Sequence, residues 1–302
     1  MTNKRILIIG EPCIDVIHKA DGRILNEHGG ISYSVVASSI LGDGVEVVPI
    51  IGLHESDAGY FVNLFNQLGN VNLSGIYRSK IRTRRVDLFY EDENRRWECS
   101  TLPTEPAPLE WILKFLPADG IHVNLISGTD INLSDLQYVR EASRGSIIHL
   151  DLHNIVMRHL PDGKRVRGPR EDYLSWCECA DTIQLNEDEA TVIDITKPSF
   201  DDLAKKILSV GPEVVIITLA ERGMLFYQLD NKEFTKKYFP PKKVNVVDPT
   251  GSGDVFGAAF LHYLVLGMSF NDAAEKAFDL AVFKAGVAGP SGMIKWAENH
   301  EL

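Results

Sequence analysis

The segment NVVDPTGSGDVFGAAFL, from Asn245 to Leu261, combines a glycine-rich turn with two aspartates in a pattern that could hold and transfer a phosphate group. An apolar strand is expected to end at Asp248, and an amphipathic helix is expected after the turn. Gly251 and Gly253 lack a Cβ atom, so the backbone N–H groups of the turn can converge on one point. The unpaired N–H groups and the positive dipole end of a helix that begins there would form a binding site for an anion.

Asp254 follows this turn directly and would place its carboxylate beside a bound phosphate. Phosphoryl transfer needs both parts, because N–H donors stabilise charge on the transferring oxygens and a carboxylate takes the proton of the attacking hydroxyl. A purely structural alternative is a tight turn made by the two glycines, with Asp254 as a helix cap. The dinucleotide-binding fingerprint does not fit, since Gly257 comes one position too late, and the sequence contains no GxxxxGKS/T motif.

The overall composition is that of an ordinary globular protein. The chain has 302 residues, 44% of them hydrophobic and 24% charged, which is enough for one large or two modest domains. Its 31 Lys and Arg against 42 Asp and Glu give a formal net charge of −11 at pH 7. An acidic chain is unsuited to broad binding of nucleic acid or anionic membranes, whereas a local group of N–H donors can still hold a small anion.

The sequence favours a cytoplasmic location. Four cysteines are too few for a disulfide framework and indicate reduced thiols, and Cys177 and Cys179 have no second Cys or His pair at metal-binding spacing. The apolar run Ile6–Ile9 is too short for a signal peptide, and Ala258–Phe270 is too short for a membrane span. We therefore expect a soluble, cytoplasmic protein without a membrane or nucleic-acid partner.

Short apolar runs alternate with longer amphipathic segments along most of the chain. Buried strands are predicted at Arg5–Gly10, Val45–Gly52, Ile121–Ser127, Ser146–Asp151, Thr182–Leu185 and Glu213–Leu219. Helices are predicted at Ser34–Leu41, Ser56–Leu68, Asn132–Arg144, Arg170–Cys179 and Phe200–Val210. This alternation predicts a parallel sheet with helices on both faces.

One region breaks the alternation, because Arg82–Tyr90 and Arg95–Thr101 are expected to form a hairpin around an acidic turn with no helix beside it. The segment Cys13–Gly29 has a similar mixture of polar and apolar residues and could supply partner strands. No internal repeat or low-complexity linker divides the sequence. We expect a single domain over residues 1–302, with a small β-strand lid within about 13–30 and 80–102.

Taken together, these motifs resemble those of the ribokinase-like (PfkB) carbohydrate kinase family. DPTGSGD at 248–254 followed by GAAFL at 257–261 is similar to the carboxy-terminal signature of that family. Further matches follow in the family's order, at Gly10 with Asp15, Gly29-Gly30 with Leu41-Gly42, Ile51-Gly52 with Asp57 and Gly59, Asn186 with Glu189, and Thr218-Leu-Ala-Glu-Arg-Gly223. The resemblance implies a ribokinase-like three-layer α/β/α fold with a mostly parallel central sheet and a small β-strand lid.

For the transfer step, the resemblance implies that Asp254 is the general base that activates the acceptor hydroxyl. Gly251, Ser252 and Gly253 would form the anion hole for the transferring phosphoryl group. The cofactors implied are ATP and Mg²⁺.

On the donor side, the resemblance implies that Asn186 and Glu189 help to position Mg²⁺ and the phosphates, with Glu189 acting on the metal through water. Thr218, Gly223 and Thr250 would border the nucleotide. A monovalent cation such as K⁺, held by carbonyls of the loop within Phe278–Ser291, stays open, because a carbonyl site leaves no side-chain signature.

On the acceptor side, the resemblance implies that Asp15, Gly29, Gly30 and Ser34 bind the hydroxyls of a sugar-like molecule. A carboxylate can accept two hydroxyl hydrogen bonds, and paired glycines permit close approach of the backbone. The lid strands would exclude water during transfer. Because lid strands of this family often pair between subunits, a homodimer through these strands is the expected assembly.

Several positions depart from the family pattern. Ser34 stands where an asparagine is usual, and Ala220 replaces a usual loop glycine. The sequence Asp151-Leu-His153-Asn154 stands where many sugar kinases of the family have Asp-x-Asn-x-Arg, so acceptor contacts there are expected to differ. His153 is interpreted as a packed histidine without a catalytic role. The basic loop Arg158–Arg170 is interpreted as a solvated surface loop, with contact to an anionic acceptor or to the phosphates as the alternative.

The sequence therefore predicts an ATP-dependent kinase that transfers the γ-phosphoryl group to a hydroxyl of a sugar or sugar-like acceptor. A catalytically inactive sugar- or nucleotide-binding regulatory protein on the same fold is the alternative. An intact DPTGSGD segment argues against that alternative, because the base and the anion hole would be the first parts lost. A flavin or nicotinamide enzyme is disfavoured, since Gly10-Glu-Pro-Cys-Ile-Asp15 contains no second glycine.

Overall fold

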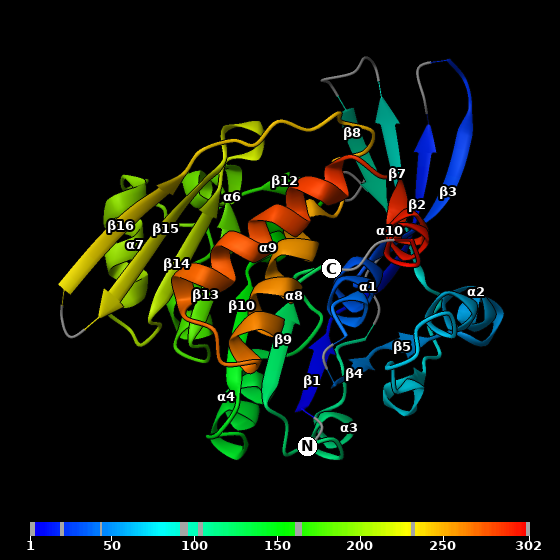
Figure 1. The fold of residues 1–302 in the computed structure, drawn as a ribbon, viewed down its shortest axis with the longest axis horizontal. Helices are drawn as coiled ribbons and strands as arrows, with labels where there is room; N and C mark the ends of the chain where they lie inside the picture. The colour runs from blue at the N-terminus through cyan, green and yellow to red at the C-terminus, as the bar shows by residue number, and fades with distance from the viewer. Residues whose placement is uncertain are drawn as a thin grey trace.

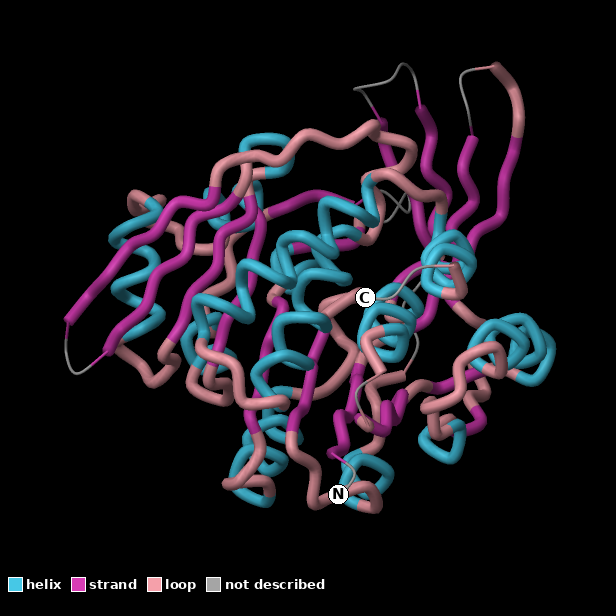
Figure 2. Tube along the Cα trace, viewed as in Figure 1, coloured by secondary structure: helices cyan, strands magenta, loops and turns pink. Residues whose placement is uncertain are grey.

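The computed structural model shows a central β-sheet with helices on both faces and a smaller sheet at one end (Figure 1, Figure 2). It describes residues 4–18, 21–42, 44–90, 96–101, 105–160, 165–230 and 233–299. The eight central strands found in these ranges are, in spatial order, β16 (Glu233–Phe239), β15 (Met224–Asp230), β14 (Val214–Thr218), β13 (Thr182–Asn186), β10 (Ile147–Asp151), β9 (Gly120–Asn124), β1 (Lys4–Ile9) and β4 (Val45–Ile50).

Neighbouring strands pair in parallel from β4 to β14, and β15 and β16 extend the sheet by antiparallel pairing. The parallel strands are covered on both faces, which explains why a strand such as β14, with the sequence VVIIT, is apolar almost throughout. The six strands predicted from the sequence correspond to β1, β4, β9, β10, β13 and β14. The predicted α/β fold with a mostly parallel sheet is confirmed.

The helices form two layers, each with its own buried core. One core includes α1 (Ser32–Ile40), α2 (Glu55–Phe65), α8 (Ser252–Val265), α9 (Phe270–Ala285) and α10 (Gly289–Ala297). The other includes α3 (Leu109–Leu113), α4 (Leu133–Ala142), α5 (Tyr173–Cys177), α6 (Glu187–Val192) and α7 (Phe200–Leu208). Figure 1 shows α8 and α9 in front of the sheet. Within the described ranges, none of these helices combines the length and apolar character needed to cross a bilayer.

The smaller sheet is the predicted lid. Its strands are β3 (Ile24–Gly30), β2 (Pro12–His18), β7 (Arg84–Tyr90) and β8 (Arg96–Ser100), in that spatial order. Strands β2 and β7 pair in parallel, and the two outer pairs are antiparallel. Figure 1 shows the lid strands projecting above α10. The acidic turn expected between the two hairpin strands lies outside the described residues.

Short elements complete the described chain: β5 (Gly52–Leu53), β6 (Tyr77–Arg78), β11 (Met157–His159), β12 (Arg165–Arg167) and the 3₁₀ turns Leu73–Gly75, His153–Val156 and Ala220–Arg222. Part of the basic loop expected as irregular surface thus forms the small hairpin β11–β12. The predicted strand Val45–Gly52 is divided between β4 and β5.

Two helix starts differ from the prediction. Helix α1 begins at Ser32, after the glycine pair and the N-cap Ile31, and α2 begins at Glu55. The second helix was predicted to begin at Ser56, but its N-cap is His54, whose Nδ1 atom accepts a hydrogen bond from the Ser56 N–H at 3.2 Å. Histidine is outside the usual set of N-cap residues, so the preference for Ser, Thr, Asp and Asn misplaced the helix start.

The predicted strand that ends at Asp248 is wrong. Strand β16 stops at Phe239, because Pro240 and Pro241 carry no N–H donor for a ladder. The chain then runs as an irregular connection, and the N–H groups of Val247 and Asp248 both donate to the Ala285 carbonyl at the end of α9. The turn before α8 is therefore attached to a helix end and not to a strand.

The carboxyl ends of the parallel strands meet at one edge of the central sheet. Asn124, Asp151, Asn186 and Thr218 are the last residues of β9, β10, β13 and β14, respectively. In open α/β sheets this edge is where ligands bind.

Candidate active site

The predicted phosphate-binding turn lies at the amino end of α8. Its N-cap, Gly251, has a left-handed φ of +81°, and a Cβ atom there would overlap the buried ring of Tyr33 in α1. At Gly257, a Cβ would lie 2.8 Å from Gln184 Oε1 and 2.9 Å from His149 Nε2. Glycine is therefore required at both positions for α8 to approach α1 and the sheet.

The amide groups of this turn have two different roles. Ser252 N–H donates to the Pro249 carbonyl at 3.2 Å, so this predicted anion-hole group is engaged within the loop. Val255 N–H makes the first intrahelical bond, to Gly251 O at 2.9 Å. The N–H groups of Gly253 and Asp254 precede that bond and have no carbonyl partner inside the helix, so they are the amides available to an anion.

Asp254 lies in the first turn of α8 and is only 8% exposed. Asn124 at the end of β9 donates from Nδ2 to Asp254 Oδ1 at 2.7 Å. Ser34 is fully buried and donates to the Asp254 backbone carbonyl at 3.3 Å. The Asn124 bond thus orients the Asp254 carboxylate, whereas Ser34, predicted to bind the acceptor, bonds the Asp254 backbone and is closed to solvent.

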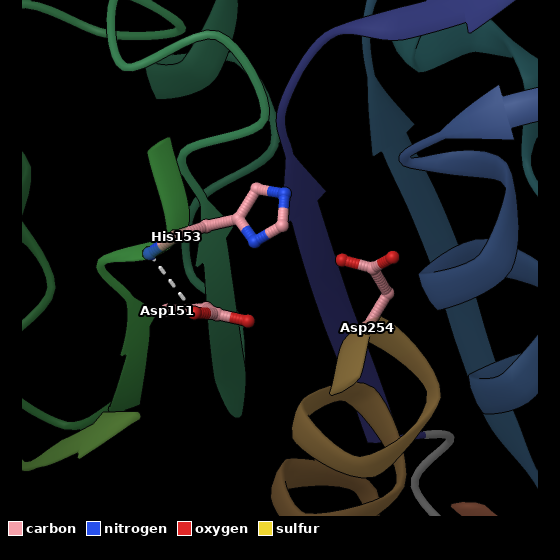
Figure 3. A group of neighbouring side chains, drawn as sticks. All are labelled: Asp151, His153 and Asp254. Carbon is pink, nitrogen blue, oxygen red and sulfur yellow. Dashed lines mark hydrogen bonds between the residues drawn. The ribbon is translucent and has the colours of Figure 1, made fainter. Parts of the chain in front are cut away.

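Asp151 and His153 face Asp254 across the carboxyl edge of the sheet (Figure 3). Each of the three side chains offers a ligand atom, and these atoms lie within 4.8 Å of one another. Asp151 is buried, and this burial together with the carboxylates of Glu189 and Asp254 raises its pKa well above the usual range. The His153 N–H donates to Asp151 Oδ1 at 3.1 Å, and Gln184 Nε2 donates to Asp151 Oδ2 at the same distance.

Asn186 and Glu189 form a capping box at the start of α6. Asn186 Oδ1 accepts from the Glu189 N–H at 2.9 Å, and Glu189 Oε2 accepts from the Asn186 N–H at 2.7 Å. Burial raises the pKa of Glu189 to about 8. Glu189 Oε1 lies 3.8 Å from His153 Nδ1, which connects the capping box to the Asp151 group.

The other residues predicted on the donor side lie near the same edge. Thr218 is the register partner of Asn186 on the adjacent strand, and Gly223 closes the following turn with a φ of +91°. A Cβ at Gly223 would overlap the Phe239 carbonyl. Within the described residues, the buried oxygens Thr250 Oγ1 and Ser252 Oγ have no hydrogen-bond partner. Two unpaired hydroxyls beside a helix amino end suit a phosphate ligand.

The predicted acceptor residues belong to the base of the lid. Asp15 is buried on β2, where Cys13 Sγ donates to its Oδ1 at 3.1 Å. A Cβ at Gly29 on β3 would overlap the Asp15 carboxylate, so glycine at this position makes room for the acid. Gly30 has a φ of +57°, which turns the chain from β3 into α1.

Sequence reasoning missed residues that reach this edge from separate strands. Asn124 was not selected because the strand was predicted to continue to Ser127, whereas β9 ends at Asn124; Gln184, which lies near the end of the predicted strand Thr182–Leu185, was not selected either. His153 was interpreted as a packed residue, yet it projects into the same space as Asp151 and Asp254 (Figure 3). The available signal was the strand-end position itself, since the carboxyl ends of parallel strands share one edge.

The donor set fits a divalent cation. Asp151, Glu189 and Asp254 bring three buried carboxyl groups close together, and a positive ion would relieve the repulsion that ionisation creates. Carboxylate oxygens are the ligands that Mg²⁺ prefers. His153 adds a nitrogen donor to this set.

Comparison with known proteins agrees with this geometry. Residues 153–297 match the sequence pattern described as the pfkB family carbohydrate kinase. A cytidine kinase from Thermococcus kodakarensis is 26% identical over 267 residues, which cover 85% of this chain and 87% of that protein. A pyrophosphate-dependent kinase in the ribokinase family superposes with a TM-score of 0.78 at 21% identity, covering 94% of this chain and 96% of the other. Ribokinase from Thermotoga maritima superposes with a TM-score of 0.74 at 18% identity, covering 98% and 99%.

The sheet order and the small lid sheet are those of the ribokinase fold. Residues 153–297 carry the pfkB family carbohydrate kinase pattern, and the curated relatives are kinases, so the protein is a carbohydrate or nucleoside kinase.

Proposed function

We propose that this protein transfers the γ-phosphoryl group of ATP to a hydroxyl of a sugar-like acceptor, with Asp254 as the general base. The observation that carries the proposal is the position of Asp254. Its carboxylate lies in the first turn of α8, beside the two amides available to an anion and opposite Asp151. A base and an anion site on the same helix end are what an in-line transfer to a hydroxyl requires.

In the proposed step, the acceptor oxygen forms a bond to the γ-phosphorus while the bond from that phosphorus to the β,γ-bridging oxygen breaks. The acceptor proton moves to the Asp254 carboxylate, and ADP leaves with the electron pair of the broken bond. The Asn124 amide orients the carboxylate through its 2.7 Å hydrogen bond. The Gly253 and Asp254 amides and the Thr250 and Ser252 hydroxyls would bind the phosphoryl oxygens.

Mg²⁺ would be held at the carboxyl edge by Asp151 and by Glu189, the latter through water because its own oxygens accept bonds within the capping box. When bound, the ion would neutralise charge on the donor phosphates. The protein itself would hold the phosphates at the amino end of α8 and orient Asp254 through Asn124.

The nucleotide base would lie along the connection between β16 and α8. Val246 and Val247 are 64% and 62% exposed, which is unusual for valine next to a helix layer. Val244 packs toward Gly286 at the end of α9, so this connection has an apolar side close to the turn. Apolar side chains of this kind commonly line nucleotide sites.

The acceptor would bind between Asp15 and Asp254, with the lid above it. We further propose that residues 1–302 act as one kinase domain and that two copies associate through the lid. Ile24 and Leu25 on the edge strand β3 are 57% and 39% exposed, and an exposed apolar edge favours pairing with a second copy. Light scattering coupled to gel filtration tests the dimer, and a mass of one chain would contradict it.

A coupled assay of acceptor-dependent ADP release tests the proposed function. Purified protein with Mg·ATP is offered sugars, sugar acids, polyols and nucleosides, with nucleosides included because a relative is a cytidine kinase. Inorganic pyrophosphate is run as a second donor with a phosphate-release readout, because a ribokinase-fold neighbour depends on pyrophosphate. We expect ADP release with one acceptor class. ATP binding by calorimetry without transfer to any acceptor would favour the inactive binding protein.

A further inference from the structure

Lys284, near the end of α9, is a completely buried lysine with an unusual set of neighbours. Its Nζ atom donates to the backbone carbonyl of Asp248 at 2.8 Å and to that of Val287 at 3.2 Å. A carboxylate oxygen of Asp248 lies 3.5 Å from Nζ, and the centre of the Tyr33 ring lies 5.2 Å away. Burying an ammonium group is costly unless it is paired in this way.

These contacts lie directly beneath the phosphate-binding turn. Asp248 is the first residue of that turn, and its carboxylate accepts from Thr250 N–H at 3.0 Å and from Gly289 N–H at 3.3 Å. The Tyr33 ring faces the ammonium group of Lys284. The same ring lies so close to Gly251 that it leaves no room for a Cβ atom there. The charge of Lys284 thus stabilises the turn through the carbonyl and carboxylate of Asp248 and does not contact the amides that are available to an anion.

The oxygen atoms around Lys284 Nζ are of the kinds that coordinate monovalent cations in proteins. Two backbone carbonyls and one carboxylate, with an aromatic face alongside, would suit a single positive charge of modest size. Here the chain's own ammonium group makes these contacts. Burial lowers the pKa of Lys284, and the neighbouring Asp248 carboxylate opposes this shift by favouring the charged form.

We propose that Lys284 is a positioning residue that supplies from within the chain the charge that a bound K⁺ would otherwise provide, so that catalysis requires no monovalent cation. The inference rests on the proposed kinase function, in that the turn it supports is the one that holds the phosphates. It predicts two properties: the unaltered protein is indifferent to small cations, and a protein without this lysine depends on them.

The first test uses the unaltered protein. Phosphoryl transfer is measured in chloride salts of choline, Na⁺, K⁺ and NH₄⁺ at constant ionic strength and saturating Mg·ATP. We expect the rates to agree within about twofold, because the site is filled from within the chain. Several-fold activation by K⁺ over choline would overturn the proposal.

The second test removes the ammonium. In Lys284→Ala, we expect kcat/KM to fall roughly tenfold to a hundredfold in choline chloride, because the Asp248 and Val287 carbonyls lose their buried partner. NH₄⁺ or K⁺ should restore much of the lost activity, whereas choline is too large to enter. Lys276→Ala, an exposed lysine on the same helix, is the control and should behave as the unaltered protein in every salt. A folded Lys284→Ala protein with full activity, or with a loss that no small cation repairs, would contradict the inference.

A stability measurement separates this inference from the proposed function. The melting temperature of Lys284→Ala should rise in K⁺ or NH₄⁺ relative to choline, while that of the unaltered protein should not change. This result with no phosphoryl transfer in either protein would keep the cation role and reject the kinase. If Lys284→Ala is recovered unfolded, refolding is attempted in each salt. Recovery only with the small cations would support the inference, and recovery in none would overturn it.

Discussion

Three buried carboxyl groups lie close together at the proposed active site. Glu189 and Asp151 are buried beside Asp254, and burial raises the pKa of both. For Glu189 the pKa rises to about 8, against an ordinary value of 4.5. Burial therefore favours the protonated form of Glu189, and a divalent cation that favours the ionised form competes with this proton.

At the residue scale, this competition predicts pH-dependent Mg²⁺ binding. Mg²⁺ favours the ionised carboxylate, so its apparent affinity should increase from about pH 6 to about pH 8 and level off above the raised pKa of Glu189. Titration calorimetry in buffers of different ionisation enthalpy would report both the affinity and the protons released.

Two variants serve as controls for this prediction. Glu189→Gln should lose the part of the pH dependence that Glu189 contributes, while Asp151, whose pKa is also raised, supplies the remainder. Asp188→Asn changes an exposed acid in the same helical turn and should retain it. Equal Mg²⁺ affinity of the unaltered protein at the two ends of this pH range would contradict the assignment.

At the scale of elements, the amino end of α8 depends on glycine for its geometry. Gly251 combines a left-handed φ with direct contact between its backbone and the Tyr33 ring. Gly267, just beyond the other end of α8, has a similar φ of +90° but open space where a Cβ would lie. Alanine substitution at each of these two glycines therefore separates two contributions to the loss of stability, the left-handed backbone conformation and the steric clash with Tyr33.

We therefore predict different effects for the two alanine variants. Gly267→Ala should lower the free energy of unfolding by about 1–2 kcal/mol, which is the cost of a left-handed φ for a residue with a Cβ. Gly251→Ala should lose about 1–3 kcal/mol more, because the methyl group also displaces Tyr33. Urea denaturation measures the difference, and phosphoryl transfer should fall in Gly251→Ala alone. Equal losses in the two variants would show that the Tyr33 contact is unimportant.

The sequence was informative where function depends on local spacing. DPTGSGD predicted the turn and the start of α8, and the alternation of apolar runs predicted the parallel sheet. Contacts between distant segments were not accessible in the same way. Asn124 reaches Asp254 across 130 positions, and Lys284 reaches Asp248 across 36. The segment before Asp248 was predicted as a strand because its valines are apolar, but its amide groups bond to the end of α9.

At the scale of the whole molecule, one buried ion pair joins the lid to the body. Arg84 on β7 is fully buried, and its Nη1 atom lies 3.3 Å from Glu11 Oε2 and 3.4 Å from the Ile126 carbonyl beyond β9. Its Nη2 atom donates to Ser100 Oγ on β8 at 3.1 Å. The guanidinium group thus links two lid strands to the edge where the acceptor is proposed to bind.

Removal of this arginine should loosen the lid. Arg84→Met leaves the Glu11 carboxylate buried without its cationic partner, and a broken buried pair costs about 3–5 kcal/mol. We expect a lower melting temperature and a raised KM for the acceptor, with a smaller change in the KM for ATP. Arg85→Met alters the exposed neighbour on the same strand and should change neither. A variant of Arg84 with unaltered stability and acceptor KM would show that this pair does not hold the lid.

Asp254 is proposed to take the proton of the acceptor hydroxyl, and a comparison of Asp254→Asn with the unaltered protein tests this role. We predict that kcat falls by about 10²–10⁴ while ATP affinity measured by calorimetry changes little. Asp272→Asn is the control, because Asp272 occupies the same position in the first turn of α9 on an exposed surface. Near-full activity in a folded Asp254→Asn protein would contradict the role of Asp254 as the base.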